Sequence, residues 1–196
     1  MYADPLSGVD AAVVKSASPS FMIIKDKEFE LFIPDASLQQ TVQKMAQAIN
    51  QDYAGLHPLV LPVLNGAFMF ASDLMKAVTI PVELSFIKLK SYQGTKSTGN
   101  IENLIGLQDE IAGRHVIIVE DIVDTGKTLR FTLDALSARN PASIAIATLL
   151  HKSEMTEVPL DLRYVGFEIP NRFVVGYGLD YDGYGRNLKD IYQLKN

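Results

Sequence analysis

The feature that most constrains the fold is a run of four apolar residues at 116–119, which ends in two adjacent acids, Glu120 and Asp121. A continuous apolar run without alternation is typical of a strand that is buried on both faces. Runs at 59–64 and 143–150 have the same character, and stretches with helical spacing lie between them. Strands that alternate with helices predict an α/β fold with a central, mainly parallel sheet flanked by helices.

Periodicity and turn residues predict the other elements. In the helix expected at 35–51, five apolar residues fall on one face by the i, i+4, i+7 rule: Leu38, Val42, Met45, Ala46 and Ile49. Asp35 is the expected cap of this helix. Further helices are expected at 67–78 and 128–139, and further strands at 29–33, at 82–90 and twice within 163–177. The polar stretch at 91–101, with two glycines, predicts a loop.

Size and composition bound the class of protein. The 196 residues suit one domain, which we expect at 21–196 behind a loosely packed arm at 1–20. The net charge of −5 argues against general nucleic-acid binding, and no stretch approaches the roughly 20 apolar residues that span a bilayer. An acid near the N-terminus is atypical of a signal peptide, and the chain has no cysteine. We expect a cytoplasmic protein that binds neither nucleic acid nor membrane.

The residues after the acidic pair favour a phosphate site. Thr125, Gly126, Lys127 and Thr128 stand at an expected helix start, where free amides and the helix dipole attract anions. Carboxylates beside a phosphate would repel it. Glu120 and Asp121 are therefore expected to bind hydroxyl groups or a divalent cation, both of which a ribose phosphate ligand brings.

Three alternatives compete with a ribose phosphate site. The acids are solvated strand-end residues in the first. A nucleotide-hydrolysing P-loop shares the ending GKT, but its first glycine would have to stand where Asp121 does. A receiver domain also carries paired acids, but near its N-terminus and with a phosphoacceptor aspartate in a later strand, and neither condition is evident here.

The segment EDIVDTGKT, residues 120–128, resembles the motif by which type I phosphoribosyltransferases bind phosphoribosyl pyrophosphate (PRPP). The resemblance implies that Glu120 and Asp121 bind the ribose hydroxyls and that 125–128 hold the 5′-phosphate, with Ile122 and Val123 lining the same loop. Asp124 is implied as the general base that takes a proton from the purine. A helix N-cap is the structural alternative for Asp124.

The segment at 165–188, with LLHK at 149–152, is similar to the branch of this family that acts on 6-oxopurines, the hypoxanthine-guanine enzymes. By that resemblance Phe173 stacks on the purine, between Arg172 and Val174, and Lys152 donates to the 6-oxygen. Adenine would offer no acceptor at that position. The structural alternatives are a core position for Phe173 and a surface position for Lys152.

The same resemblance implies the metal, pyrophosphate and lid sites. Asp180 would help the two acids of the motif, Glu120 and Asp121, to hold Mg²⁺. Leu64, Asn65 and Gly66 occupy the position of the pyrophosphate loop, which often carries a cis peptide bond, and Arg186 would bind the pyrophosphate too. Some relatives have lysine where this chain has Asn65. The pair Ser91 and Tyr92 matches the head of the closing loop.

The implied activity is Mg²⁺-dependent transfer of phosphoribosyl from PRPP to hypoxanthine, with guanine left open, in purine salvage. A small hood built from the chain ends and a homodimer or homotetramer belong to the same expectation. The alternatives are a related enzyme for xanthine or a pyrimidine, and a regulatory protein that keeps the PRPP site but binds nucleic acid. The net charge and the presence of Asp124 oppose the regulator.

Overall fold

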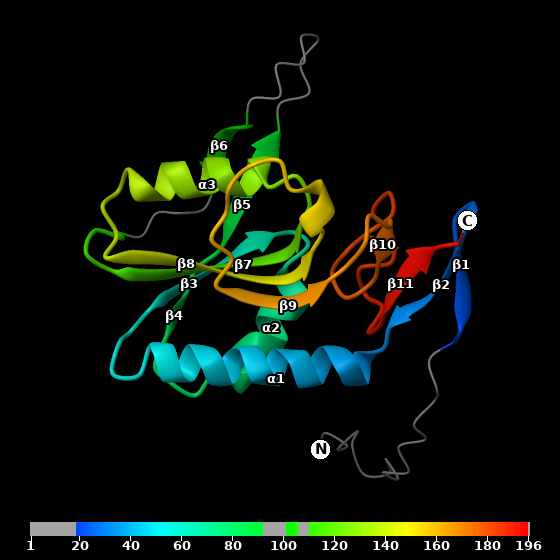
Figure 1. Ribbon diagram of the computed structural model, residues 1–196, viewed down its shortest axis with the longest axis horizontal. Coiled ribbons are helices and arrows are strands. Elements are labelled where there is room, and N and C mark those ends of the chain that lie inside the picture. The colour runs from blue at the N-terminus through cyan, green and yellow to red at the C-terminus, as the bar shows by residue number, and fades with distance from the viewer. Residues whose placement is uncertain (1–18, 92–100, 106–109, 196) are drawn as a thin grey trace, which may run out of the picture.

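The structure is a computed structural model that describes residues 19–91, 101–105 and 110–195. Within these residues the chain forms a seven-stranded central sheet and a separate four-stranded sheet made from the two chain ends (Figure 1). The predicted α/β fold, with a mainly parallel sheet flanked by helices and a hood from the chain ends, is confirmed. The predicted N-terminal arm lies outside the described residues except for its last two.

The central sheet has the order β6-β5-β3-β7-β8-β9, and β4 pairs with β3. Its strands are β3 (Leu59–Leu64), β4 (Glu83–Leu84), β5 (Ile87–Ser91), β6 (Ile101–Ile105), β7 (His115–Val123), β8 (Ser143–His151) and β9 (Tyr164–Glu168). Among these pairings only β5 with β6 is antiparallel. The carboxyl ends of β3, β7 and β8 therefore meet at one edge, where open α/β sheets bind ligands.

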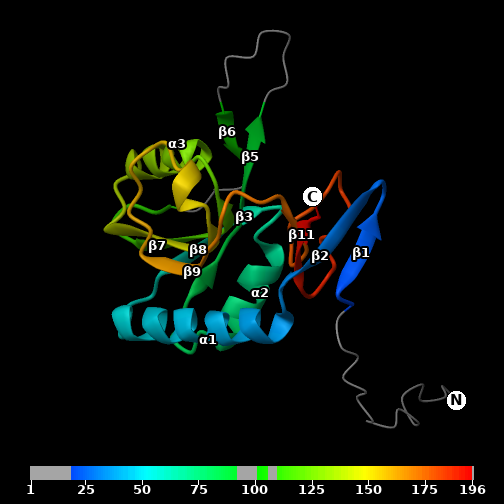
Figure 2. The same cartoon turned by 45° about the vertical axis from the view of Figure 1, so that its right-hand side comes forward.

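Helices cover both faces of this sheet. The helices α1 (Asp35–Asp52) and α2 (Phe68–Ala77) pack on one face and α3 (Lys127–Ser137) on the other (Figures 1 and 2). In β7, Ile117 and Val119 belong to the core under α1 and α2, whereas Val116 and Ile118 belong to the core under α3. Each successive residue of β7 meets a helix, and this explains why its sequence is continuously apolar.

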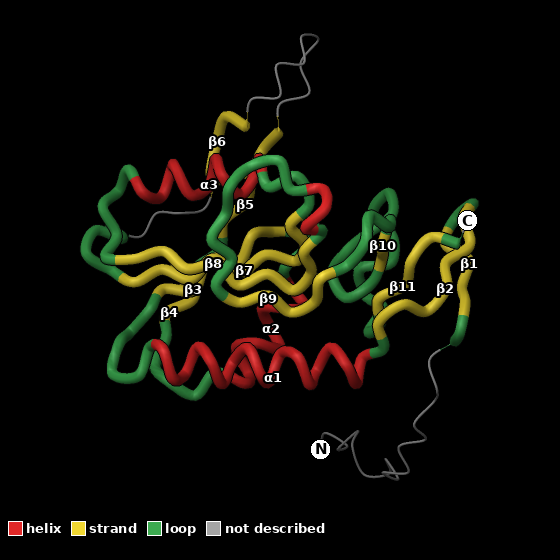
Figure 3. The backbone as a smooth tube through the Cα atoms, in the orientation of Figure 1, coloured by secondary structure: helices red, strands yellow, loops and turns green. Residues whose placement is uncertain are grey.

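The hood is an antiparallel sheet that joins residues far apart in the sequence (Figure 3). Its strands, in the order β1-β2-β11-β10, are β1 (Phe21–Ile24), β2 (Lys27–Ile33), β11 (Ile191–Leu194) and β10 (Val174–Val175). Phe29, Val175 and Tyr192 are buried in a small core of its own. The loop between β10 and β11 runs back toward the central sheet and supplies residues of the candidate site.

Two expected elements differ in the structure. The strand expected at 82–90 is divided into β4 and β5, which pair with separate parts of β3, at Leu59–Val60 and at Val63–Leu64. The expected loop at 91–101 is bounded by a strand that the sequence did not predict, β6, which pairs with β5. Most of that loop lies outside the described residues.

The start of α1 also corrects a prediction, since Asp35 is not its cap. Pro34 stands at the N-cap position without a side-chain bond, and Asp35 is the first helical residue. The Asp190 carboxylate, from the start of β11, accepts the Asp35 amide at 2.8 Å and is only 2% exposed. The helix is thus capped from a site 155 residues away in the sequence, which ties the hood to the central domain.

In the described ranges, none of the helices has both the length and the apolar character to cross a membrane. The expected location in the cytoplasm stays a prediction.

We expect Asp190→Ala to lower the free energy of unfolding by about 1–3 kcal/mol, because a buried helix amide loses its acceptor. Urea unfolding followed by circular dichroism measures this. Asp134→Ala is the control: Asp134 pairs with Arg130 on the exposed face of α3, and its loss should cost less than about 0.5 kcal/mol. Equal losses in the two variants would contradict the capping role.

Candidate active site

Two acids lie at the carboxyl end of β7. Glu120 is 8% exposed, and its Oε2 atom is buried without a hydrogen-bond partner. The strand continues past both acids to Val123, which pairs with His151 of β8, so Ile122 and Val123 are strand residues rather than loop residues. The acids are held on a strand, and the alternative of a solvated strand end is wrong for Glu120, which is buried.

Burial changes the protonation of both acids. It raises the pKa of Glu120 well above its usual range, and repulsion by Asp121 adds to this. It also raises the pKa of Asp121 to about 6, although two backbone amides and Arg186 oppose the shift and Asp180 contributes to it. A buried carboxylate oxygen without a partner calls for a hydroxyl donor or a cation.

The loop after β7 forms the wall of a cleft of about 230 Å³, which is lined by residues 120–126 and by Thr128 and Leu129. Gly126 is the N-cap of α3 and has a φ of +78°, a conformation that favours glycine. The first backbone bond of α3 runs from the Arg130 amide to the Gly126 carbonyl. The helix itself gives no partner to the amides just before Arg130, and the Lys127 amide has only a long contact, of 3.5 Å, to Thr125 Oγ1. These amides can receive an anion.

The predicted phosphate residues differ in what they offer. The Lys127 ammonium pairs with Glu157 at 2.5 Å, so this residue would contribute its amide rather than its charge. The Glu157 amide also bonds the Thr125 carbonyl at 3.0 Å. The phosphate loop is thereby fastened from behind by the segment that follows β8.

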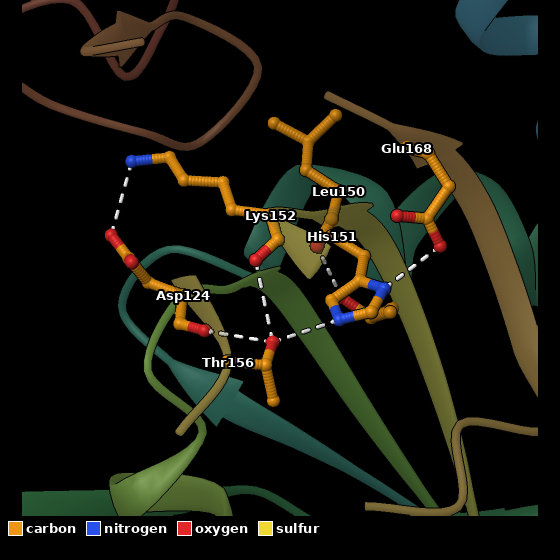
Figure 4. Close-up of polar contacts among 7 residues, drawn as sticks. Asp124, Leu150, His151, Lys152, Thr156 and Glu168 are labelled. Carbon is orange, nitrogen blue, oxygen red and sulfur yellow. Dashed lines mark hydrogen bonds and ion pairs between the residues drawn. The ribbon is translucent and has the colours of Figure 1, made fainter. Parts of the chain in front are cut away.

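Asp124 follows β7 directly and faces Lys152, as Figure 4 shows. The Lys152 ammonium donates to Asp124 Oδ2 at 3.0 Å, and Asp124 Oδ1 is buried without a partner. The N-cap alternative for Asp124 is wrong, because Gly126 holds that position. The surface alternative for Lys152 is wrong as well, since this lysine is 8% exposed. The predicted general base and the predicted base-recognition residue are thus neighbours.

The predicted pyrophosphate loop lies against the acids. The Leu64–Asn65 peptide bond is cis. A Cβ atom on Gly66 would stand 1.6 Å from Asp121 Oδ2, so only glycine allows this approach. Asn65 is exposed at the tip of the loop.

The loop between β10 and β11 closes the same edge of the site. A Cβ atom on Gly178 would lie 2.0 Å from the Gly66 carbonyl oxygen. Arg186 donates to the Gly178 carbonyl at 2.6 Å and pairs with Asp180 at 2.5 Å. Asp180 and Arg186, to which the resemblance assigns the metal and the pyrophosphate, form an ion pair in this loop, and both lie near enough to Asp121 to affect its pKa.

Phe173 does not belong to the core, contrary to the alternative for this residue. Its side chain is 47% exposed and packs edge-to-face on Tyr181, with the ring centroids 5.9 Å apart. Arg172 is exposed beside it, whereas Val174 is buried in β10. An exposed aromatic face held by another ring is a suitable platform for a planar ligand.

Sequence reasoning missed the support of the hood loop. Tyr177 stands between two glycines and has itself a φ of +50°. Its hydroxyl donates to Asp73 Oδ2 at 2.7 Å. Gln39 of α1 donates to the same oxygen at 2.8 Å. The signal was the GYG triplet at 176–178, because glycines around an aromatic residue indicate a tight crossing of the backbone.

The predicted lid is only partly within reach. Ser91 ends β5, and Tyr92 lies outside the described residues. In the described ranges, no three His, Asp or Glu side chains form a group able to hold a metal alone. The donor set still fits Mg²⁺, which takes one or two carboxylates and fills its other positions with water and substrate phosphate.

Comparison with known proteins agrees with this geometry. Residues 35–182 match the model of the phosphoribosyl transferase domain. The chain is 39% identical to the hypoxanthine-guanine phosphoribosyltransferase of Streptococcus thermophilus, over 89% of this chain and 97% of that protein. The solved enzyme of the same name from Bacillus anthracis superposes with a TM-score of 0.76 at 38% identity, covering 85% of this chain and 97% of its own.

A hypoxanthine phosphoribosyltransferase of Trypanosoma cruzi, solved as a ternary substrates complex, superposes with a TM-score of 0.78 at 40% identity, over 84% of this chain and 94% of that one. The bifunctional protein TilS/HprT of Listeria monocytogenes is 39% identical over 85% of this chain, which spans 26% of that protein. The chain therefore belongs to the phosphoribosyltransferase family, in its hypoxanthine-guanine branch.

We expect Asp121→Asn to raise the free energy of unfolding at pH 7 by about 1–3 kcal/mol. The Asp121 pKa is about 6 in the fold and ordinarily 3.8, so its ionisation costs stability that grows from about pH 4 and is complete above pH 6. Urea unfolding at pH 4 and pH 7 measures the difference, which should vanish toward the lower pH. A variant less stable than the parent at pH 7 would contradict this.

Proposed function

We propose that the protein is a hypoxanthine phosphoribosyltransferase of purine salvage, which joins PRPP to hypoxanthine and releases pyrophosphate. The observation that carries the proposal is the Lys152–Asp124 pair, at 3.0 Å, beside the phosphate loop and the buried acids. One member of the pair suits the 6-oxygen of a purine, and the other suits the proton that the purine must lose. The relatives named for this activity support the assignment.

PRPP would be bound through its 5′-phosphate and through its ribose hydroxyls. The amides of 125–128 receive the 5′-phosphate at the start of α3, where the helix dipole also attracts it. The ribose hydroxyls donate to Glu120 and Asp121, and the unpartnered Oε2 of Glu120 gains the hydrogen bond that it lacks. Holding the sugar at both ends orients its anomeric carbon, and such orientation removes much of the entropic barrier.

The purine would lie on the exposed face of Phe173, with its edge toward Val174 and its 6-oxygen on Lys152. The bond from the anomeric carbon to the pyrophosphate oxygen breaks as the bond to the purine nitrogen forms. That nitrogen transfers its proton to the Asp124 carboxylate, whose Oδ1 atom has no other partner. Asp124 is thus assigned as the general base.

The leaving pyrophosphate would be held by Arg186 and by the backbone of the loop at 64–66. The Asn65 side chain carries no charge, so amides take the place of a lysine there. We propose that Glu120, Asp121 and Asp180 bind Mg²⁺ together with the substrate. When bound, Mg²⁺ neutralises charge on the departing pyrophosphate. A homo-oligomer in the cytoplasm is part of the proposal and awaits its own measurement.

A second candidate is transfer to xanthine or guanine, since the Lys152 ammonium can serve any 6-oxopurine. Steady-state assays with PRPP, Mg²⁺ and each base in turn separate these cases. We expect consumption of hypoxanthine and formation of the nucleoside monophosphate. Consumption of xanthine or a pyrimidine alone would overturn the proposal, and so would the absence of any consumption.

Asp124→Asn should reduce kcat by about 10²–10⁴-fold, because the amide cannot accept the purine proton. Its affinity for PRPP should stay within about threefold of the parent, since the phosphate loop is intact. Isothermal titration with PRPP and steady-state kinetics measure both. Asp134→Asn, in an exposed pair on α3, is the control that should leave kcat unchanged. Full turnover by Asp124→Asn would remove Asp124 from the mechanism.

Phe173→Ala should raise the KM for hypoxanthine about 5–150-fold, because stacking on an aromatic ring contributes about 1–3 kcal/mol. The KM for PRPP should change little. Phe86→Ala is the control, because this phenylalanine is similarly exposed, at 43%, but belongs to neither the cleft nor the hood. Parallel rises in both KM values of Phe173→Ala would indicate general misfolding of the hood instead of a lost base platform.

A further inference from the structure

A single hydroxyl group lies behind the Asp124–Lys152 pair. Thr156 Oγ1 is 3.1 Å from the Asp124 carbonyl oxygen and 3.3 Å from the Lys152 carbonyl oxygen (Figure 4). These are main-chain atoms of the two residues whose side chains meet at the proposed reaction centre. Thr156 itself touches neither carboxylate nor ammonium, so its hydroxyl acts on the placement of both residues rather than on a substrate.

The hydroxyl is held in turn by a histidine. His151 Nε2 lies 3.0 Å from Thr156 Oγ1, and His151 Nδ1 lies 2.8 Å from Glu168 Oε1. A carboxylate only accepts, so Nδ1 carries the proton of that bond. The Thr156 hydroxyl has a single hydrogen, so it can donate to the two carbonyl oxygens only where His151 Nε2–H donates to Thr156 Oγ1. In that arrangement both ring nitrogens carry a hydrogen, and the Glu168 carboxylate lies beside the ring as its ion-pair partner.

The main chain around this hydroxyl has few other ties between the two loops. The Lys152 amide bonds the Val123 carbonyl at 2.9 Å, directly before Asp124. Beyond that point the β7–β8 ladder ends, and the next main-chain bond between the two loops runs from the Glu157 amide to the Thr125 carbonyl. Thr156 lies where the bonds of the ladder end. Its hydroxyl links the carbonyl oxygens of Asp124 and Lys152, the residues that directly follow β7 and β8.

We propose that Thr156 is a positioning residue of the reaction, oriented by His151 and Glu168, and that it sets the Asp124 carboxylate and the Lys152 ammonium at the separation that a 6-oxopurine requires. This inference rests on the proposed function and deepens it. The pair must meet two atoms of one rigid purine at once, so a small shift of either main chain lowers both recognition and proton transfer.

The test compares three variants of the full-length protein in steady-state assays with hypoxanthine and PRPP. Thr156→Val keeps the shape and removes the hydroxyl, whereas Thr156→Ser keeps the hydroxyl. Thr148→Val is the matched control, because Thr148 is fully buried in β8 and donates to the Leu150 carbonyl of the same strand at 2.8 Å, and not to a main-chain atom of Asp124 or Lys152.

For Thr156→Val we expect kcat to fall about tenfold and the KM for hypoxanthine to rise about threefold, as for the loss of one hydrogen bond that orients reacting groups. The KM for PRPP should stay within about twofold, because the phosphate loop keeps its own ties. Thr156→Ser and Thr148→Val should both remain within about twofold of the parent in all constants, even where their melting temperature falls.

Thr156→Val with unchanged kcat and unchanged KM for hypoxanthine would overturn the positioning role. If that variant does not fold, His151→Phe takes its place, since it removes the partner of the hydroxyl at a half-buried position. It should lower kcat in the same direction, and an unchanged kcat would again overturn the role. A parent protein that consumes no hypoxanthine overturns the proposed function itself, and the positioning role falls with it.

Discussion

The burial of two neighbouring carboxyl groups at the end of β7 is the constraint on which the rest of the structure depends. Burial raises the pKa of both groups, so their ionisation has a cost that a ligand with hydroxyls or a cation would relieve. The cost is tolerable because β7 is packed by helices on both faces and keeps the acids from turning to water. The strand thus holds the two acids in a fixed position, whereas a flexible loop would let them reach solvent.

The hood shows how the chain ends complete a site that the central sheet begins. The backbone at Gly178 crosses the Gly66 carbonyl, and Gly66 lies against Asp121, so three segments distant in sequence are in direct contact. Asp190 and Tyr177 hold this arrangement from the side by bonding α1 and α2. Neither contact lies in the candidate site, but both hold the hood loop that carries Asp180 and Arg186.

The sequence predicted the parallel sheet, because both-face burial leaves an unmistakable apolar run, and it predicted the acidic strand end and the phosphate loop from residue chemistry. Resemblance added Lys152, Asp180 and Arg186, of which the structure places the first beside Asp124 and the other two near Asp121. It also added Phe173, which the structure places on the exposed surface of the hood. The sequence did not predict β6, because the pairing of β6 with β5 leaves no strong pattern in the residues. It did not predict Asp190 as the cap of α1 either, because that contact spans 155 residues. The role of Thr156 was not predicted either, because a lone threonine in a polar turn carries no periodic signal.

The Lys152–Asp124 contact has a further consequence for selectivity. In the resting state the cation and the anion satisfy each other, and Lys152 is almost wholly shielded from water. A ligand that engages only Asp124 leaves the nearly buried Lys152 ammonium without its partner, and an unpaired buried charge is unfavourable. A ligand that carries an acceptor for Lys152 and an acidic N–H for Asp124 on one planar edge replaces both halves of the ion pair at once. We therefore expect the ion pair to favour ligands that carry both groups over ligands that carry only one of them.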